Sequence, residues 1–354
     1  GGTRQMTVNT KRVFYVKYLA DGCFADILGE RPDIQLQRLE NESPDSAAAP
    51  VLAAAHAYQV GSSRDELHAK YHVDAALLAR TPNLLAVSTN GAGYDTVDLE
   101  ACTKAGVLAV NQAGGNREAV AEHVLAMMLC LSKRIIQTDR FMRRASGIER
   151  NAFMGNDVYG KCIGVVGIGH VGSRVAELCR SLFAMRVLAY DPYLPAAEIA
   201  ARGAEPVALD DLLRRADYVS LHCPLAADTR GMIGRRQFAL MPPHAYFIST
   251  ARGGIHDEAA LAEALAEKRL AGAGLDVWAK EPPPSDHPLL RFDNVLVSPH
   301  TAGVTREARA NIAKIAAEQM LAILDGKRPP RLLNPSVWPA YAKRFERAFG
   351  FTPG

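Results

Sequence analysis

The chain has 354 residues, of which 48% are hydrophobic and 22% are charged, a composition typical of globular rather than disordered or fibrous proteins. This length predicts two domains, since a domain commonly contains about 100–200 residues. The net charge of +3 is too small to indicate a nucleic-acid surface. The most apolar stretch, residues 119–131, contains Glu122 and His123, so no membrane span is expected. The six cysteines lack C-x-x-C spacing and are expected to be reduced thiols in a cytoplasmic protein.

Short apolar runs alternate with helical stretches along the chain. Strands are predicted at Arg12–Leu19, Ile34–Leu39, Ala55–Val60, Leu84–Ser88 and Gly106–Val110. A long helix is predicted from about Asn116 to Ala145, and a second alternating run begins at Cys162–Val166. This order predicts an α/β protein with two Rossmann-like domains, each built on a parallel sheet covered by helices. Ligands of such sheets bind at the carboxyl ends of the strands.

The C-terminal part of the chain is predicted to contain one more helix, Arg306–Leu324, and then a proline-rich tail. The tail region contains Trp338 and Tyr341. Large aromatic side chains gain most when they are buried, so the tail is expected to pack on the body of the protein.

A glycine-rich motif, G-x-G-x-x-G, lies at Gly167, Gly169 and Gly172. It follows the apolar strand and opens a helix, Val171–Leu182, which is the context that dinucleotide binding requires. The first glycine permits a tight turn, the second lets the backbone approach a pyrophosphate, and the third lets the helix pack closely on the strand. The N–H groups at the start of the helix, including those of His170 and Val171, would then face the pyrophosphate.

An aspartate, Asp191, follows the next predicted strand, Arg186–Tyr190. A carboxylate at this position can accept hydrogen bonds from both hydroxyls of the adenosine ribose and repels a 2′-phosphate. The motif therefore predicts NAD as the cofactor, with NADH preferred over NADPH.

Three later segments each place a polar residue after a predicted strand. They carry Arg252, the pair Asp276 and Glu281, and His300. An arginine can bind a carboxylate with two hydrogen bonds, and a histidine can exchange a proton near neutral pH. A neighbouring carboxylate can orient the imidazole and raise its pKa. With a nicotinamide, these groups suit the interconversion of a 2-hydroxy acid and a 2-keto acid. No cluster has metal-ligand spacing, so no metal is predicted.

Together these motifs resemble the D-isomer specific 2-hydroxyacid dehydrogenases, which include phosphoglycerate, glycerate and hydroxypyruvate dehydrogenases. The resemblance covers about residues 12–335. It is carried by GIGHVG at 167–172, LHCPL at 221–225, STARGG at 249–254, GAGLDVWAKEP at 272–282 and SPHTAG at 298–303.

The resemblance implies roles for individual residues. Arg252 resembles the family's anchor for the substrate carboxylate and carbonyl, His300 its acid/base, and Glu281 the partner of that histidine. Asp276 resembles the residue that contacts the nicotinamide carboxamide. The N–H groups of the loop at Ala92 and Gly93 would bind the substrate carboxylate. Arg252 and His300 would also contact the substrate. The other cofactor contacts that the resemblance implies are Cys223, Thr250, Ala251 and Gly303.

The family's fold implies a discontinuous arrangement of two domains. A flavodoxin-like substrate-binding domain would comprise residues 6–117 and 305–354, and an NAD-binding Rossmann domain residues 118–304. The active site would lie in the cleft between them. Relatives commonly form homodimers through a segment that Asn116–Gly160 resembles, so a homodimer is expected.

The resemblance favours an NAD(H)-dependent reductase of a small 2-keto acid such as hydroxypyruvate or glyoxylate. Thr89 stands where some phosphoglycerate enzymes have an arginine, which disfavours phosphoglycerate. Formate dehydrogenases share the architecture but usually have glutamine where Glu281 stands, so formate is also disfavoured. Phosphite oxidation remains open. The family also includes a corepressor that binds NAD and acts as an interaction module, and an exposed peptide-docking surface would distinguish that alternative.

Overall fold

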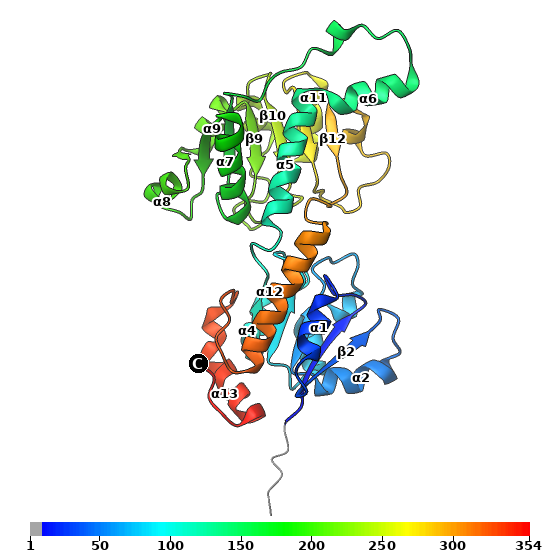
Figure 1. The fold of residues 1–354 in the computed structure, drawn as a ribbon, viewed down its shortest axis with the longest axis vertical. Coiled ribbons are helices and arrows are strands. Elements are labelled where there is room, and N and C mark those ends of the chain that lie inside the picture. Colours follow the sequence, from blue (N-terminus) through cyan, green and yellow to red (C-terminus); the bar gives the residue numbers. More distant parts are fainter. Residues whose placement is uncertain (1–8) are drawn as a thin grey trace, which may run out of the picture. The chain divides into compact units, whose positions relative to one another are not determined.

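The computed structural model describes residues 9–354, in which the chain forms two compact units (Figure 1). The first unit comprises the chain up to Asn116 together with Arg306–Gly354, and the second comprises Arg117–Thr305. Each unit has a parallel sheet with helices on its faces, which confirms the predicted α/β class. Residues 6–8, which the expected first domain includes, lie outside the described part.

The first unit has a five-stranded parallel sheet in the order β2-β1-β3-β4-β5. The strands are β1 (Lys11–Val16), β2 (Ile34–Leu39), β3 (Ala57–Val60), β4 (Ala86–Thr89) and β5 (Leu108–Val110). The connecting helices are α1 (Cys23–Gly29), α2 (Asp45–Ala54), α3 (Ala75–Arg80) and α4 (Leu99–Ala105). The first strand was predicted to extend to Leu19, but β1 ends at Val16 because Lys17 has a φ of +71°, which no strand residue adopts.

Successive strand residues in this sheet belong to two different apolar clusters. Phe14, Tyr58 and Val87 pack with α2, α3 and α4 on one face. Their chain neighbours, including Val13 and Ala57, pack with α1 and the C-terminal helices on the other face. Both faces of the sheet are therefore buried, as expected of parallel strands joined by crossover helices.

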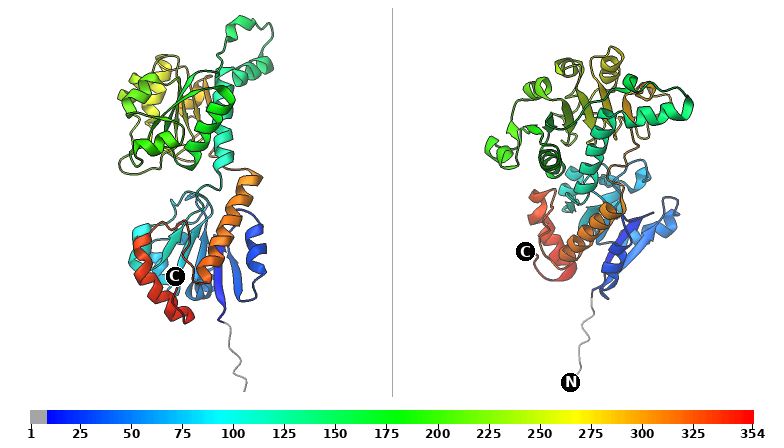
Figure 2. Two further views of the ribbon diagram at one scale, coloured as in Figure 1. Left: turned by 60° about the vertical axis from the view of Figure 1, so that its left-hand side comes forward. Right: turned by 45° about the horizontal axis from the view of Figure 1, so that its top comes forward.

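The C-terminal segment completes the first unit with α12 (Arg306–Leu324) and α13 (Trp338–Phe349). Figure 2 shows both helices beside the five-stranded sheet. Tyr341 and Phe345 of α13 are fully buried in the same cluster as α12, which confirms that the tail packs on the body. The helix α12 has the predicted bounds, whereas α13 was not predicted.

The second unit has a seven-stranded parallel sheet in the order β12-β11-β10-β9-β6-β7-β8. The strands are β6 (Cys162–Val166), β7 (Arg186–Tyr190), β8 (Glu205–Pro206), β9 (Tyr218–Leu221), β10 (Tyr246–Ser249), β11 (Gly272–Leu275) and β12 (Val295–Val297). Its helices are α5 (Arg117–Ser132), α6 (Ile135–Arg144), α7 (His170–Phe183), α8 (Ala196–Ala201), α9 (Leu209–Arg215), α10 (Arg235–Leu240) and α11 (Glu258–Ala266). Short 3-10 turns occur at Ala69–Tyr71, Arg150–Phe153, Pro288–Arg291 and Pro335–Val337.

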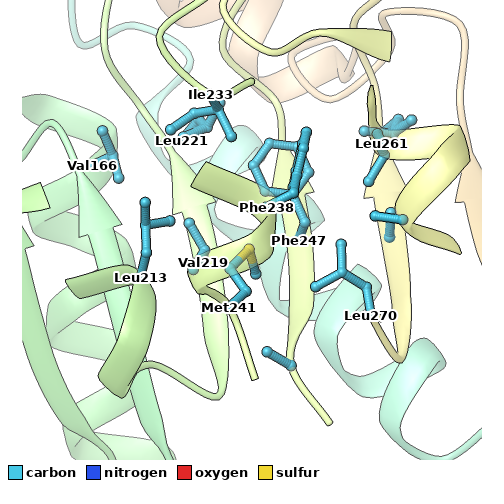
Figure 3. Packing of buried hydrophobic residues seen from close by; sticks show 14 of the residues in the cluster. Val166, Leu213, Val219, Leu221, Ile233, Phe238, Met241, Phe247, Leu261 and Leu270 are labelled. Carbon is cyan, nitrogen blue, oxygen red and sulfur yellow. The ribbon is translucent and has the colours of Figure 1, made fainter. Parts of the chain in front are cut away.

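The strand order of this sheet reverses at β6, which lies between β7 and β9. Loops that leave the two sides of such a switch point diverge and open a crevice for a ligand. One face of the sheet packs on α5 and α7. The other packs on α9, α10 and α11, where Phe238 and Phe247 meet edge to face (Figure 3).

The predicted long helix from Asn116 to Ala145 is wrong in one respect, because it is two helices, α5 and α6. Arg134 between them has a φ of +56°. The carbonyl of Ser132, near the end of α5, accepts a hydrogen bond from Asn156 N at 2.8 Å. In Figures 1 and 2, α6 and the loop after it extend away from the rest of the second unit. In residues 9–354, no helix combines the length and the apolar composition that a membrane span needs.

Candidate active site

The glycine loop joins β6 to α7 in the second unit. Gly167 has a φ of +88°, and a Cβ on Gly172 would lie 2.1 Å from the carbonyl oxygen of Gly167, so both positions require glycine. A Cβ on Gly169, in contrast, would meet nothing within 4 Å. The backbone at Gly169 is therefore open to a ligand, as the approach of a pyrophosphate requires.

The first turn of α7 faces the same loop. Its first backbone hydrogen bond runs from Ser173 N to Gly169 O at 2.9 Å, so the preceding N–H groups, including that of Val171, point out of the helix. His170 is the first residue of α7, and its side chain is exposed. The positive end of the helix and these N–H groups suit an anion.

Asp191 follows β7 and lies beside the glycine loop. Its two carboxylate oxygens accept hydrogen bonds from Ile168 N at 3.0 Å and from Tyr193 N at 3.1 Å. These bonds fix the carboxylate and leave further lone pairs on both oxygens. The side chain can therefore accept hydrogen bonds from a ribose bound at the loop.

The turn after β9 packs against Gly167, because a Cβ on this glycine would lie 2.8 Å from Cys223 N. The Cys223 side chain is half-buried, and burial raises the pKa of its thiol to about 11. Cys223 is therefore an uncharged thiol at neutral pH, next to the candidate cofactor loop.

Arg252 follows β10, after Thr250 and Ala251, which are both buried. One guanidinium nitrogen donates to Ala251 O at 2.8 Å. A Cβ on the next residue, Gly253, would lie 1.8 Å from Trp278 O, so this loop makes backbone contact with the segment after β11. This contact brings Arg252 near the residues that follow β11.

His300 and Glu281 form a hydrogen-bonded pair, with His300 Nδ1 and Glu281 Oε2 2.7 Å apart. Their side chains are 42% and 29% exposed. The hydrogen bond to Glu281, opposed by burial and aided by the carboxylate charge, holds the pKa of His300 above its ordinary value. Burial raises the pKa of Glu281, but the bond to His300 and the nearby positive charges outweigh burial and lower it overall. Arg252 is close enough for its charge to lower the pKa of both residues.

Asp276 follows β11 and is only 1% exposed. Its Oδ1 accepts hydrogen bonds from Ser298 Oγ and Thr301 N, both at 2.7 Å, and its Oδ2 accepts one from Ala302 N at 3.1 Å. These bonds to Asp276 hold the loop that carries His300 in place. The loop ends near Gly303, which is half-buried. Oδ2 keeps a lone pair that could accept a further hydrogen bond.

Ala92 and Gly93 lie in the first unit, in the loop after β4. The carbonyl of Ala92 accepts a hydrogen bond from Asn111 Nδ2 at 2.9 Å. Within residues 9–354, the N–H groups of Ala92 and Gly93 have no acceptor, so they could bind an anion. Thr89 is buried and donates to Gly91 O at 2.8 Å.

The second unit thus places the glycine loop, Asp191, Cys223, Arg252, Asp276, Glu281 and His300 at or after the carboxyl ends of β6, β7, β9, β10, β11 and β12. His123 on α5 also reaches this region, with its Nε2 2.9 Å from Ser298 Oγ. The sequence did not predict this contact, because a single histidine on a helix does not indicate its partner. Among the described residues, no group of three His, Cys, Asp or Glu side chains could hold a metal ion.

Comparison with known proteins agrees with the geometry. Residues 125–302 match the family described as D-isomer specific 2-hydroxyacid dehydrogenase, NAD binding domain. A D-3-phosphoglycerate dehydrogenase of Archaeoglobus fulgidus is 39% identical over 295 residues, which are 80% of this chain and 56% of that protein. A glyoxylate reductase of Korarchaeum cryptofilum is 37% identical over 268 residues, which are 75% of this chain and 80% of that protein.

Solved structures show the same similarity. The crystal structure of a D-lactate dehydrogenase from Aquifex aeolicus, complexed with NAD and lactic acid, has a TM-score of 0.76 and 26% identity. The match covers 89% of this chain and 96% of that one. The chain spans little more than half of the Archaeoglobus protein but most of the Korarchaeum and Aquifex proteins. From its motifs, its fold and these matches, the chain belongs to the D-isomer specific 2-hydroxyacid dehydrogenase family, with an NAD-binding domain.

Proposed function

We propose that the protein is an NAD(H)-dependent oxidoreductase that interconverts a small D-2-hydroxy acid and its 2-keto acid, of the hydroxypyruvate or glyoxylate type. The observation that carries this proposal is the His300–Glu281 pair at 2.7 Å, with the pKa of His300 raised and Arg252 close by. A histidine that keeps its proton near neutral pH is suited to protonate the oxygen on C2 during reduction.

Each of these side chains has a distinct task in the proposed reaction. Arg252 binds the carboxylate of the substrate and polarises the neighbouring carbonyl. His300 donates a proton to the carbonyl oxygen in reduction and accepts it in oxidation. Glu281 orients the imidazole and stabilises its charged form. Ala92 and Gly93 bind the substrate carboxylate through their N–H groups, a role that rests on the family resemblance and on the lack of an acceptor for these groups among residues 9–354.

The second unit would bind the cofactor, with the first unit binding substrate. Gly167, Gly169, His170, Val171 and Gly172 would hold the pyrophosphate, and Asp191 the adenosine ribose. Cys223, Thr250, Ala251, Asp276 and Gly303 would line the rest of the cofactor site. When bound, NADH supplies the hydride that reduces C2. The Asp191 carboxylate would repel a 2′-phosphate, which favours NADH over NADPH.

The proposal extends to a homodimer in the cytoplasm. Helix α6 has no buried residue, and Ile135, Met142 and Met154 on α6 and its flanking segments are 50%, 67% and 71% exposed. Exposed apolar side chains in one projecting segment suit a contact with a second copy. All six cysteines are unpaired, which supports a reducing compartment.

The test is NADH oxidation, followed by absorbance, with hydroxypyruvate, glyoxylate, pyruvate, phenylpyruvate and phosphohydroxypyruvate. A clear preference for one 2-keto acid would support the proposal if kcat for that acid is about 10²–10⁴-fold lower in His300→Ala. Full activity in His300→Ala would refute the acid/base role. No activity on any 2-keto acid, with NADH binding retained, would refute the proposed reaction.

A further inference from the structure

We propose that His123 is a positioning residue, which acts through Ser298 and Asp276 on the loop that carries His300. This inference rests on the proposed function and assigns a role to a helix residue outside the catalytic set.

Hydrogen-bond chemistry sets the direction of the contacts. His123 Nε2 lies 2.9 Å from Ser298 Oγ, and Ser298 Oγ lies 2.7 Å from Asp276 Oδ1. An ionised carboxylate can only accept, and a serine hydroxyl has one proton. Ser298 therefore donates to Asp276 and must accept from His123, so His123 carries a proton on Nε2. His123 thus donates to Ser298, and Ser298 donates to the buried carboxylate of Asp276.

Asp276 in turn holds three successive residues of the loop. Its side chain accepts from Thr301 N and Ala302 N, and its backbone oxygen accepts from His300 N at 2.8 Å. His300 has a φ of +57°, a conformation that non-glycine residues seldom adopt unless their surroundings impose it. The bonds to Asp276 hold the backbone at His300 and at the two residues after it.

The packing of α5 explains how His123 reaches this loop. A Cβ on Gly274 of β11 would lie 2.9 Å from Met127 Sδ, so α5 crosses β11 closely at that point. His123 lies one helical turn before Met127, and Asp276 lies two residues after Gly274. The start of α5 is thereby placed over the carboxyl end of β11, beside the end of the neighbouring strand β12, where the His300 loop begins. The His123 side chain is 26% exposed, and its Nε2 lies 3.9 Å from Asp276 Oδ1.

The decisive experiment compares His123→Leu with His123→Gln. Leucine removes the donor, whereas the amide nitrogen of glutamine can take the place of Nε2. We expect His123→Leu to lower kcat by about 10–100-fold, because misplacing a catalytic group by about 1 Å can cost about 10²-fold. KM and the Kd of NADH should change little. His123→Gln should recover most of the lost kcat.

The chain offers a matched control in His244. This histidine also bonds an aspartate in the second unit, with Nε2 2.7 Å from Asp217 Oδ1, but at the amino end of β9. His244→Leu removes a similar bond away from the loop and should leave kcat unchanged. A loss of kcat in this variant equal to that of His123→Leu would overturn the specific role of His123.

A pH profile separates positioning from a general structural effect. If the loop loosens in His123→Leu, the His300–Glu281 hydrogen bond is less populated and the pKa of His300 falls. The pH at which the reduction rate declines should then move downward in His123→Leu and stay in place in His123→Gln. The inference would be overturned if the rate of His123→Leu declines at the same pH as that of the wild type. An equal loss of kcat in His123→Leu and His123→Gln would also overturn it.

Two further measurements keep the result interpretable. If His123→Leu fails to fold, Ser298→Ala removes the bridging hydroxyl, and it should lower kcat and shift the pH profile in the same direction. If the wild type reduces no 2-keto acid, the proposed function fails, but amide hydrogen exchange at residues 300–302 still tests the contact. Faster exchange there in His123→Leu than in His244→Leu would support the positioning role, and equal exchange would overturn it.

Discussion

At the scale of single residues, the proposed function makes the His300–Glu281 pair the source of the proton for reduction. The hydrogen bond to Glu281 raises the pKa of His300. In the proposed reaction, reduction needs protonated His300, so the rate should be constant below this pKa and fall as the pH rises through it. The decline should therefore lie above the ordinary histidine pKa of about 6.5.

In Glu281→Gln the carboxylate charge is lost, and the pKa of His300 should fall. The decline of kcat/KM for reduction should then move to lower pH, which initial rates across the neutral range would measure. A decline at the same pH in both proteins would show that Glu281 does not set the pKa of His300.

Asp191 carries the proposed preference for NADH. Its carboxylate is fixed by Ile168 N and Tyr193 N and keeps lone pairs for the ribose. Hydrogen bonds to charged groups contribute about 1.5–3 kcal/mol, so Asp191→Ala should lower kcat/KM for NADH by roughly 10–100-fold. The value for NADPH should fall less or rise, because the repulsion is gone. Asp211→Ala, which removes an exposed carboxylate on α9, should leave the NADPH-to-NADH ratio unchanged. An unchanged NADPH-to-NADH ratio of kcat/KM in Asp191→Ala would show that Asp191 does not set the cofactor preference.

Most candidate residues could be predicted because each one follows a strand in a recognisable local pattern. The pairing of Glu281 with His300 agrees with the role that the resemblance implies. His123 was missed because its contact with Ser298 joins residues 175 positions apart and leaves no local pattern. The bonds of Asp276 to Thr301 N and Ala302 N were missed for the same reason.

At the scale of elements, α13 is the part of the fold that the sequence did not indicate. Its buried residues, Tyr341 and Phe345, pack in the cluster formed with α12 and one face of the five-stranded sheet. Arg344 also donates to the carbonyls of Leu84, Gly106 and Pro82, before β4 and β5. The prolines before and at the start of α13 made the short amphipathic pattern of this helix hard to recognise.

Phe345→Ala should lower the free energy of unfolding by about 3–5 kcal/mol, the usual cost of removing a buried aromatic side chain. Lys343→Ala, at an exposed position of the same helix, should change it by less than about 0.5 kcal/mol. Urea unfolding would measure both. Equal midpoints for the wild type and Phe345→Ala would mean that α13 adds nothing to the stability of the first unit.

The break between α5 and α6 shows where local pattern is overridden by tertiary contacts. Residues 132–135 contain no glycine or proline to end a helix. The break is stabilised by residues further along the chain, since Arg134 donates to Ala152 O at 2.9 Å and lies over the ring of Phe153. A helix pattern read residue by residue could not include these contacts.

At the scale of the whole molecule, the apolar side chains of α6 and the following loop predict the oligomeric state. A double variant, Met142→Glu with Met154→Glu, should convert a dimer into a monomer, because it places charges in the proposed contact. Light scattering at micromolar concentration would measure the mass. Leu182→Glu, at an exposed position of α7 outside this segment, should remain dimeric. A wild-type mass near 38.2 kDa would contradict the proposed dimer.

The central claim, reduction of a 2-keto acid at C2 to a D-2-hydroxy acid, is tested most directly by the labelled product. The protein is given NADH with deuterium at both C4 positions and its fastest 2-keto acid other than glyoxylate, whose product has no stereocentre at C2. We predict a D-2-hydroxy acid that carries deuterium at C2. An L-product, or a product without deuterium at C2, would contradict the account.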